Sequence, residues 1–551
     1  MRILGISGGF GHDAAACLLV DGKMIAAAEE ERFTRIKTAP GSVPIQSTLY
    51  CLSAGKCELS DIDLVAVGWD PNLDPSAEYL PQTFWRFYSH EMWSRTRIPP
   101  FKYIPHHLAH AASAFFGSGY RDAAIIVLDG NGENVSTTLA TGHGTEISIH
   151  QQFGITNSLG QFYTKASEFA GLGTHGEGKL MGLSAFGEPR YDFPIRLTNG
   201  GYEIDLPNVD ALSAAERFAR LGESWHSQFA EIVGAANQRR HYWDVGQSGV
   251  AAACELTPRE RDFAASVQAC LTETILHLVR VLVGSTGKRD VVLAGGVGLN
   301  CNANGAILRS GLVDNLYIFP AAHDAGVAVG AAFQAAAEHN ELSAIPVDQA
   351  YWGPCFGDES IKKLLDDFNL RHDSYTDVTP IVAEALSMDK VVGWFQGRME
   401  LGPRALGNRS ILASPSGTDI RDRVNSIKRR EEWRPLSPSI RQHWSARLLE
   451  HGHASPFMLV FDRVRAEYQE RLAGVVHVDG TCRAQSVCRE TNELYWRLLS
   501  CFEEATGVPA LLNTSFNVGH EPIVCTPLDA IRTFFASGID VLCMGNHVLT
   551  K

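Results

Sequence analysis

A short sequence unit occurs twice in this chain and constrains its fold more than any other feature. Residues 2–7 form an apolar run that enters a glycine-rich turn at residues 8–13, and two more apolar runs follow, separated by the pair Asp-Gly at residues 21–22. Residues 123–128 begin the same pattern, with Asp129 at the start of the turn. Asp-Gly between apolar runs is typical of a β-hairpin. The repeat predicts two similar α/β lobes across a cleft, although short strand–turn–strand units also recur by chance.

Length and composition restrict the class of protein. The chain has 551 residues, more than one hydrophobic core supports, so two or three domains are expected. Its net charge of −14 disfavours nucleic acid or an anionic membrane as partner. The twelve cysteines are scattered and form no Cys-x-x-Cys pair, which is typical of reduced, buried thiols. We expect a cytoplasmic protein with no signal peptide, and no apolar stretch of transmembrane length.

Two histidines and two aspartates suggest a metal site. His106 and His110 follow Pro105 at the start of an alanine-rich run that is predicted to be a helix. Residues four apart share one helix face, so both imidazoles can reach one ion. Asp129 ends the next apolar strand, and Asp324 begins a turn as a further metal or nucleotide contact. Two solvated histidines on a surface helix are the alternative for an isolated His-x-x-x-His.

A second glycine-rich turn lies in the middle of the chain. A predicted amphipathic helix at residues 259–285 is followed by an apolar strand from Val291 and then by Gly-Gly-Val-Gly-Leu-Asn at residues 295–300. Such a turn allows backbone N–H groups to approach a phosphate or ribose closely. Residues 205–250 are mixed in character and are predicted to be an inserted, mostly helical segment.

The last 200 residues begin after a polar boundary at residues 338–358 and concentrate arginine and lysine among glycine and proline. This occurs in four segments, at residues 393–410, 425–438, 477–485 and 512–522. Arginine beside a rigid turn suits two-pronged binding of phosphate or carboxylate. Solvated surface arginines are the alternative for any one segment. Four together predict a site for a polyphosphate or an acyl phosphate.

Nine motifs in this order resemble the O-carbamoyltransferases of the nodulation-factor, cephem and aminoglycoside type, over nearly the full length. They are Gly-His-Asp-Ala-Ala at 11–15, the acidic and basic run at 29–37, His-His-Leu-Ala-His at 106–110, Glu-Gly-Lys-Leu-Met-Gly at 177–182, the glycine turn at 295–300, Gly-Pro-Arg-Ala-Leu-Gly at 402–407, the run at 428–438, His-Val-Asp-Gly at 477–480 and Asn-Thr-Ser-Phe-Asn at 513–517.

The resemblance implies an α/β chain of two domains. Residues 1–345 would form a TsaD-like domain of the actin-like ATPase (ASKHA) superfamily, with two duplicated lobes, and residues 355–551 a YrdC-like α/β domain. The YrdC-like domain would make carbamoyl adenylate from carbamoyl phosphate and ATP, with Mg²⁺ accompanying ATP as co-substrate. The TsaD-like domain would transfer the carbamoyl group to a hydroxyl of a small-molecule natural product.

The resemblance also implies roles for individual residues. His12 would act as general base beside Asp13, or else make a structural hydrogen bond, and Lys428, Arg434 and Ser515 would act in adenylate formation. Carbamoyl phosphate and the ATP phosphates would be bound by Arg404, Lys428, Arg434, Arg483, Asn513 and Ser515. Fe(II) or another divalent metal would be held by His106, His110, Asp129 and Asp324. Nucleotide contacts in the TsaD-like domain would come from Gly130, Glu177, Lys179, Gly295, Gly296, Asn300 and Asn304.

Several alternatives stay open at this point. A tRNA threonylcarbamoylation-type enzyme is disfavoured because the chain lacks a long basic face, and a regulatory nucleotide-binding protein is disfavoured by the intact set of site residues. The aromatic segment at residues 79–97 either lines an acceptor pocket or packs an inserted helix. Leu436-Ser437 stands where the family often has Phe-Ala, which changes a pocket wall more than its charge. A homodimer is the default expectation.

Overall fold

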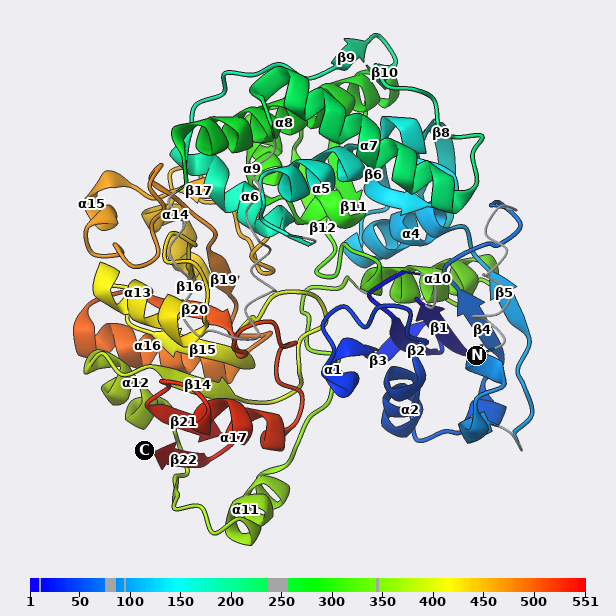
Figure 1. Ribbon diagram of the computed structural model, residues 1–551. Coiled ribbons are helices and arrows are strands. Elements are labelled where there is room, and N and C mark those ends of the chain that lie inside the picture. Colours follow the sequence, from blue (N-terminus) through cyan, green and yellow to red (C-terminus); the bar gives the residue numbers. More distant parts are fainter. Residues whose placement is uncertain (9–10, 75–85, 94–95, 174, 236–255, 343–345) are drawn as a thin grey trace. The chain divides into compact units, whose positions relative to one another are not determined.

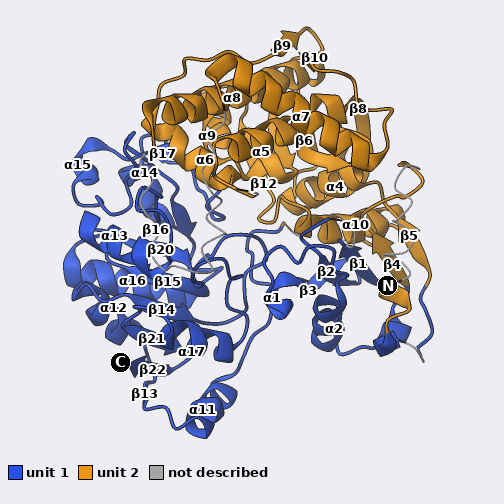
Figure 2. Cartoon of the chain, viewed as in Figure 1, with its two compact units in different colours: residues 1–63, 91–99, 347–551 blue, residues 64–90, 100–346 orange. Residues whose placement is uncertain are grey.

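The computed structural model describes residues 1–551 apart from 9–10, 75–85, 94–95, 174, 236–255 and 343–345. Helices and strands are interspersed along the whole described chain, which confirms the α/β class (Figure 1). The chain divides into two compact units, each described here by itself (Figure 2). The first unit comprises residues 1–63, 91–99 and 347–551, and the second comprises residues 64–90 and 100–346. Residues 1–63 therefore group with the C-terminal part of the chain, and the expected domain extents of 1–345 and 355–551 stay a prediction.

The first predicted strand–turn–hairpin unit lies at the N-terminus. Strands β1 (Arg2–Ser7), β2 (Ala15–Val20) and β3 (Lys23–Glu29) pair antiparallel in sequence order. The β2–β3 turn has positive φ at both of its residues, 49° at Asp21 and 71° at Gly22, which is the conformation that Asp-Gly favours in a two-residue hairpin. Helix α2 (Ile45–Ala54) packs against β2 and β3, preceded by the short helix α1 (Glu31–Thr34).

The predicted repeat is present in the second unit. Strands β6 (Asp122–Gly132), β7 (Val135–His143) and β8 (Glu146–Gly154) form the same antiparallel meander. Strands β11 (Asp290–Ala294) and β12 (Asn315–Ile318) extend the sheet on the other side of β6, parallel to it. All central residues of β6 are buried, so this strand fixes where Asp129 lies at its end.

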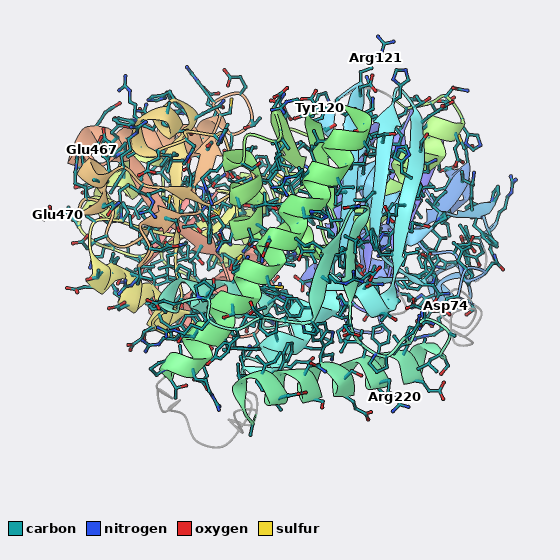
Figure 3. All side chains as sticks on the ribbon, turned by 90° about the horizontal axis from the view of Figure 1, so that it is seen from above. Asp74, Tyr120, Arg121, Arg220, Glu467 and Glu470 are labelled. Carbon is teal, nitrogen blue, oxygen red and sulfur yellow. The ribbon has the colours of Figure 1, made fainter. Side chains whose placement is uncertain are left out.

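Helices cover this sheet. Helices α4 (His106–Ser118) and α10 (Ala325–Glu338) pack closely, because a Cβ on Gly330 would lie 1.7 Å from the carbonyl oxygen of Ala109. The remaining elements of the unit are β4 (Leu64–Val67), β5 (Phe101–Tyr103), α5 (Leu159–Phe169), α6 (Glu177–Leu183), β9 (Ile195–Thr198), β10 (Gly201–Ile204), α7 (Ala214–Val233), α8 (Pro258–Thr286) and α9 (Cys301–Arg309). In the predicted insert, α7 exposes polar residues such as Arg220 on its outer face (Figure 3), and residues 236–255 lie outside the described part.

Helix α8 differs from what the sequence led us to expect about transmembrane length. By length and composition it could cross a membrane, with a mean hydropathy of 1.4 over its most apolar window, so the expectation that no apolar stretch reaches this length is wrong. A single helix of this kind is weak evidence for a membrane span, because the core helix of a soluble protein has the same length and composition. The apolar face of α8 packs against α5, α6 and α9 within the second unit, and 44% of the window is buried. The helix begins in a capping box in which the Thr257 hydroxyl accepts from the Glu260 N–H and the Glu260 carboxylate from the Thr257 N–H.

The C-terminal part of the first unit is built on an eight-stranded sheet in the order β13-β22-β21-β14-β15-β20-β16-β19. Its strands are β13 (Asp373–Ser374), β14 (Val392–Phe395), β15 (Arg409–Ala413), β16 (Ser437–Arg441), β19 (Gln485–Val487), β20 (Ala510–Ser515), β21 (Val541–Met544) and β22 (His547–Thr550), with a separate pair β17 (Asp462–Arg463) and β18 (Thr481–Cys482). Its helices are α11 (Asp358–Asp367), α12 (Thr379–Ser387), α13 (Thr418–Ile427), α14 (Ser445–Leu448), α15 (Ala466–Gln469), α16 (Glu493–Thr506) and α17 (Pro527–Phe535). The four cationic segments lie at the ends of its strands and in the adjoining loops.

Candidate metal centre and candidate anion site

The four predicted metal ligands lie together in the second unit. One ligand atom each of His106, His110, Asp129 and Asp324 falls within 4.8 Å of the other three. The Nε2 atoms of the two histidines are 3.1 Å apart. The Nε2 of His106 lies 3.6 Å from Asp129 and 3.5 Å from Asp324, and that of His110 lies 3.6 Å from Asp324. Helix α4, the end of β6 and the start of α10 therefore bring two nitrogens and two oxygens to one point.

Neighbouring groups orient two of these side chains, His106 and Asp129. The Nδ1 of His106 lies 3.2 Å from the carbonyl oxygen of Gly68, which favours the tautomer that leaves Nε2 free to accept. The Oδ1 of Asp129 accepts from the Gly296 N–H at 2.9 Å, and Oδ2 accepts from the Asn131 N–H at 3.3 Å. The buried Nδ1 of His110 has no hydrogen-bond partner among the described residues.

The electrostatics of the cluster fit a cation. Burial lowers the pKa of His106, but the carboxylates of Asp324 and Asp129 outweigh this and raise it. Burial and the neighbouring His106 lower the pKa of His110. Two imidazole nitrogens and two carboxylate oxygens form a donor set that suits a divalent transition metal. The cluster thus fits a metal, and the donor types alone do not distinguish Fe(II) from its neighbours.

Glu133 is a residue of this site that the sequence did not reveal. Helix α4 begins at His106 without a side-chain cap from the preceding residue. The Glu133 carboxylate replaces that cap and accepts from the His106 N–H at 3.0 Å and from the Asp70 N–H at 2.8 Å. The buried Arg217 of α7 donates to the Glu133 carbonyl at 3.3 Å. The first ligand is therefore held through its backbone as well as its ring. A glutamate 27 residues later in the sequence gives no signal of this role.

The second site lies in the first unit around Lys428, at the end of α13. Its buried ammonium group lies 3.1 Å from the Ser515 hydroxyl, 2.5 Å from the Ser515 carbonyl and 2.7 Å from the Asn517 side-chain oxygen. Burial lowers the pKa of Lys428, and the positive charges of Arg430, Arg434 and Lys37 lower it further. Positive groups that depress one another's protonation are what an anion would stabilise.

Three arginines surround this lysine. Arg430 was not singled out from the sequence, and its Nη2 is buried without a hydrogen-bond partner among the described residues. Arg434 lies 3.8 Å from Glu431. Arg483 donates from Nε and Nη2 to the Ser437 hydroxyl, at 3.1 and 2.9 Å. The serine that departs from the usual family pattern therefore orients an arginine, so this departure touches the charged side of the pocket as well as its wall.

The remaining residues predicted for this site differ in how their polar atoms are used. Asn513 is buried, and its amide nitrogen lies within 3.2 Å of oxygens of Ala405, Ser439 and Gln485 inside the sheet. Arg404 lies half-buried in the loop that follows Glu400. The Asn513 amide nitrogen is therefore engaged inside the sheet, whereas its buried Oδ1 has no hydrogen-bond partner among the described residues.

Four of the predicted nucleotide contacts of the second unit lie in the glycine turn or in α9, which follows it. Gly295 has a φ of 88°, and a Cβ there would lie 2.1 Å from the Leu128 carbonyl oxygen, so the glycine turn is pressed against the end of β6. Through the Gly296 N–H this turn contacts Asp129. Asn300 is engaged with Gln268 and caps α9, and Asn304 donates to the Gly298 carbonyl at 2.8 Å.

Three other predicted nucleotide contacts lie on neighbouring elements. Glu177 accepts from Thr164 at 2.8 Å, Lys179 follows it on α6, and the Gly130 carbonyl accepts from the Ser158 hydroxyl at the start of α5. Nucleotide binding by these residues stays a prediction.

The predicted general base His12 belongs to the first unit and is exposed. Its Nδ1 lies 2.8 Å from the Asp13 carboxylate. Asp13 has a φ of 58°, and its N–H donates to the Thr38 carbonyl at 2.6 Å. Asp13 thus holds one ring nitrogen, which agrees with either the catalytic or the structural interpretation of His12.

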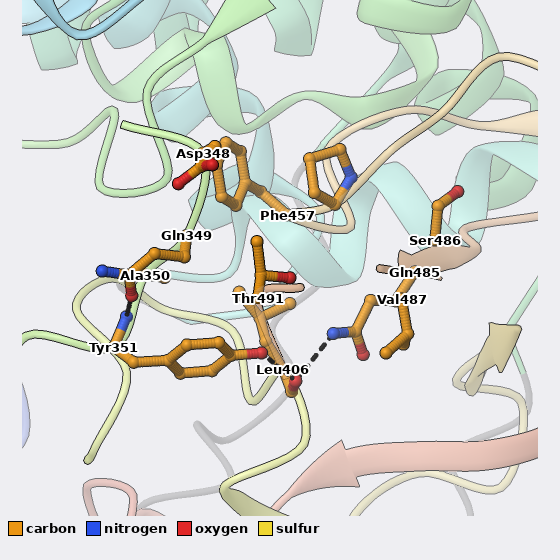
Figure 4. Close-up of a pocket in the computed structure, with 11 residues that line it drawn as sticks. Asp348, Gln349, Ala350, Tyr351, Leu406, Phe457, Gln485, Ser486, Val487 and Thr491 are labelled. Atoms are coloured by element: carbon orange, nitrogen blue, oxygen red, sulfur yellow. Dashed lines mark hydrogen bonds between the residues drawn. The ribbon is translucent and has the colours of Figure 1, made fainter. Parts of the chain in front are cut away.

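A small pocket in the first unit lies beside the Leu406 carbonyl, which accepts from the Tyr351 hydroxyl at 2.9 Å and from the Gln485 amide at 2.7 Å (Figure 4). Its wall includes Phe457 and Thr491. In the aromatic segment upstream, Phe87 and Tyr88 are buried against each other, which favours packing over a pocket wall, and residues 79–85 lie outside the described part.

The described residues thus combine a buried cluster of histidine and aspartate with a cationic pocket on an α/β chain. The chain belongs to the carbamoyltransferase family and is a carbamoyltransferase: the family model for the carbamoyltransferase N-terminus matches residues 2–92 and 77–333, and that for the C-terminus matches residues 383–551.

Its relatives include nodulation proteins of rhizobia. Nodulation protein NolNO of Sinorhizobium fredii is 35% identical over all of this chain and 83% of its own length. Nodulation protein NolO of Bradyrhizobium diazoefficiens is 37% identical over 81% of this chain and 78% of its own length. Among solved structures, full-length HypF in the phosphate- and nucleotide-bound form is a distant neighbour, with 14% identity, a TM-score of 0.36, and coverage of 62% of this chain and 56% of that one.

Proposed function

We propose that this carbamoyltransferase is ATP-dependent and acts on oxygen. It makes carbamoyl adenylate from carbamoyl phosphate and ATP in the Lys428 site, and transfers the carbamoyl group to a hydroxyl of a small-molecule natural product. The observation that carries the proposal is the Lys428 pocket, where the buried ammonium group contacts Ser515 and Asn517, and where burial and neighbouring positive charges lower the pKa values of Lys428, Arg430 and Arg434. A polyphosphate or an acyl phosphate relieves that repulsion.

Adenylate formation needs two phosphate-bearing substrates in one pocket. Carbamoyl phosphate, ATP and one water give carbamoyl adenylate, inorganic phosphate and pyrophosphate. The water hydrolyses the mixed anhydride of carbamoyl phosphate to carbamate and inorganic phosphate, and the carbamate oxygen attacks the α-phosphorus of ATP and displaces pyrophosphate. Lys428 and Arg434 neutralise the charge of the phosphates, and Arg483, held by Ser437, offers a planar pair of donors. The Ser515 hydroxyl, 3.1 Å from the Lys428 ammonium, donates to the Asn517 side-chain oxygen at 2.7 Å and would exchange that contact for a phosphoryl oxygen.

Transfer needs a polarised carbonyl group and a deprotonated acceptor. When bound at the His/Asp cluster, a divalent metal supplies Lewis-acid polarisation of a phosphate or carbonyl oxygen. His106 and His110 would hold the metal through Nε2 and Asp129 and Asp324 through oxygen, while the Gly68 carbonyl orients the His106 ring. His12 takes the proton of the acceptor hydroxyl at Nε2, while Asp13 holds its Nδ1.

The actin-like and YrdC-like assignments belong to the same proposal. The repeated antiparallel meander supports duplicated lobes in the front of the chain. A threonylcarbamoylation enzyme acting on tRNA is the second candidate, and the net charge of −14 argues against it. Cytoplasmic location and a homodimer stay predictions.

The decisive experiment separates the two half-reactions. The protein is incubated with ATP, Mg²⁺, Fe(II) and carbamoyl phosphate, without any tRNA, and pyrophosphate and carbamoyl adenylate are measured. We expect both to form, Lys428→Ala to abolish both, and His12→Ala to leave both intact while stopping carbamoylation across a panel of hydroxylated natural products. Loss of pyrophosphate release in the His12 variant would refute this division of labour.

A further inference from the structure

The acidic and basic run at residues 29–37 has no role in the function proposed above. It comprises the end of β3, helix α1 and the residues that follow, and it belongs to the first unit together with the C-terminal sheet. Two of its arginines contact loops of that C-terminal part. We call residues 29–37 the N-terminal clamp.

Arg32 is the more buried of the two, with 2% of its surface exposed. Its Nε donates to the Glu29 carboxylate at 2.7 Å, and Glu31 lies 3.1 Å away. Its Nη2 donates to the carbonyl oxygen of Gly402 at 2.8 Å, 370 residues later in the chain. A guanidinium fixed by two carboxylates is a rigid donor, so Arg32 holds the backbone of the loop that carries Arg404.

The same loop is held from its other side by Glu400. The buried Oε1 of Glu400 accepts from the N–H groups of Leu406, Asn408 and Arg409, at 2.7, 2.9 and 3.2 Å. Residues 400–409 therefore close on themselves around one carboxylate oxygen. Arg32 adds the hydrogen bond that joins this closed loop to the N-terminal segment.

Arg35 contacts the second loop of the anion site. It donates from Nη1 to the Ile523 carbonyl at 2.6 Å and from Nη2 to the Pro522 carbonyl at 2.7 Å, and its Nε lies 3.6 Å from Asp529. Two adjacent carbonyls bound by the two prongs of one guanidinium fix both the position and the direction of the chain at residues 522–523.

Lys428 contacts the same loop at its start. Its ammonium group contacts Ser515 and Asn517, and its carbonyl accepts from the Gly519 N–H at 3.0 Å. The Asn517 amide in turn donates to the Glu521 carbonyl at 2.6 Å. The loop 516–523, which follows the paired residue Ser515 at the end of β20, is thus contacted by Lys428 near its start and by Arg35 at its end, so both contacts bear on the position of Asn517.

We propose that the N-terminal clamp is a positioning element of the anion site, through which Arg32 and Arg35 set the affinity for the anionic donor although they lie at the opposite end of the sequence. The inference rests on the proposed function for its substrate, and on the contacts above for its geometry. Arg32 and Arg35 act on the loops and not on the reacting atoms.

The test uses the full-length chain with the substitution Arg35→Gln. We expect the KM for carbamoyl phosphate in pyrophosphate release to rise roughly ten-fold, because loop residues displaced by even a fraction of an ångström bind phosphate poorly, while kcat and the metal content change less than two-fold. Arg35→Lys should lie between the two, since one ammonium group cannot hold two carbonyls in a fixed fork. Arg423→Gln is the matched control: the Arg423 Nη2 donates to both carboxylate oxygens of Asp540 in the same unit, at 2.7 Å each, outside the clamp.

A second readout separates this inference from the proposed function. Inorganic phosphate should raise the Tm of the wild-type protein, and Arg35→Gln should lose most of that shift while Arg423→Gln keeps it. If the wild type releases no pyrophosphate, the proposed function fails and the phosphate shift still decides on the clamp. If Arg35→Gln keeps both the wild-type KM and the full shift, the clamp is refuted. If Arg35→Gln does not fold, Arg35→Lys decides by the same two criteria.

Discussion

At the scale of single residues, Lys428 is buried close to other positively charged side chains. Burial and the charges of Arg430, Arg434 and Lys37 hold its pKa well below the ordinary 10.5. A lysine with a lowered folded-state pKa binds its proton more tightly when unfolded, so in the absence of an anion the free energy of unfolding rises with pH between the lowered value and 10.5.

Binding of an anion should raise the lowered pKa of Lys428 again. Because a bound phosphate favours the charged ammonium group, phosphate binding should take up a proton and weaken as pH rises through the lowered pKa. Calorimetric titration with inorganic phosphate in two buffers of different ionisation enthalpy measures the uptake. We expect it in the wild type and a clear decrease in Lys428→Met. Equal heats in both buffers would contradict this account.

The metal ligands give a second prediction at this scale. His110→Ala removes one of four donors and should weaken divalent-metal binding at least ten-fold. The measurement is metal content after equilibration against a competing chelator. His143→Ala is the control, since His143 is an exposed histidine paired with Asp122 at 3.0 Å in the same unit. Unchanged metal content in the His110 variant would refute the cluster as a metal site.

At the scale of elements, the turn after β11 leaves no room for a side chain at Gly295. Gly295→Ala would place a methyl group 2.1 Å from the Leu128 carbonyl at a φ of 88°. We expect a loss of about 2–4 kcal/mol in the free energy of unfolding, and weaker metal binding because the Gly296 N–H would leave Asp129. Denaturant unfolding and metal content measure the two effects. Gly284→Ala in α8 is the control: a Cβ there meets nothing within 4 Å, so equal losses in both variants would refute the steric argument.

Sequence patterns predicted the elements better than their connections. The helix expected at residues 259–285 is α8 at Pro258–Thr286, because Thr257, Pro258 and Glu260 mark its start and Gly287 its end. The hairpin at Asp21-Gly22 follows equally from local backbone preference. Glu133, which caps α4, could not be predicted, because the cap comes from the turn between β6 and β7 that packing brings to the helix.

At the scale of the whole molecule, residues 1–63 group with residues 347–551. The fragment 355–551 would lack the contacts of Arg32 and Arg35, and that of Arg398 with the Ile25 carbonyl at 2.9 Å. We expect this fragment to unfold at a lower temperature than the corresponding transition of the full chain and to be cleaved faster by protease at residues 400–409 and 515–525. A fragment as stable and as protected as the full chain would show that the C-terminal residues form an independent domain.

The sequence by itself determined the α/β class, the doubled meander, the family, and the residue types that meet in each site, since these follow from local periodicity, turn chemistry and motif order. The tertiary structure decided which polar atoms are engaged internally, as in the side chains of Asn300 and Asn304 and the amide nitrogen of Asn513. It also decided which neighbours hold the backbone, as Arg32, Arg35 and Glu133 do. The reason is physical: a turn or a helix is specified by residues next to one another, whereas a buried hydrogen bond between Arg32 and Gly402 exists only once packing has closed 370 residues of chain.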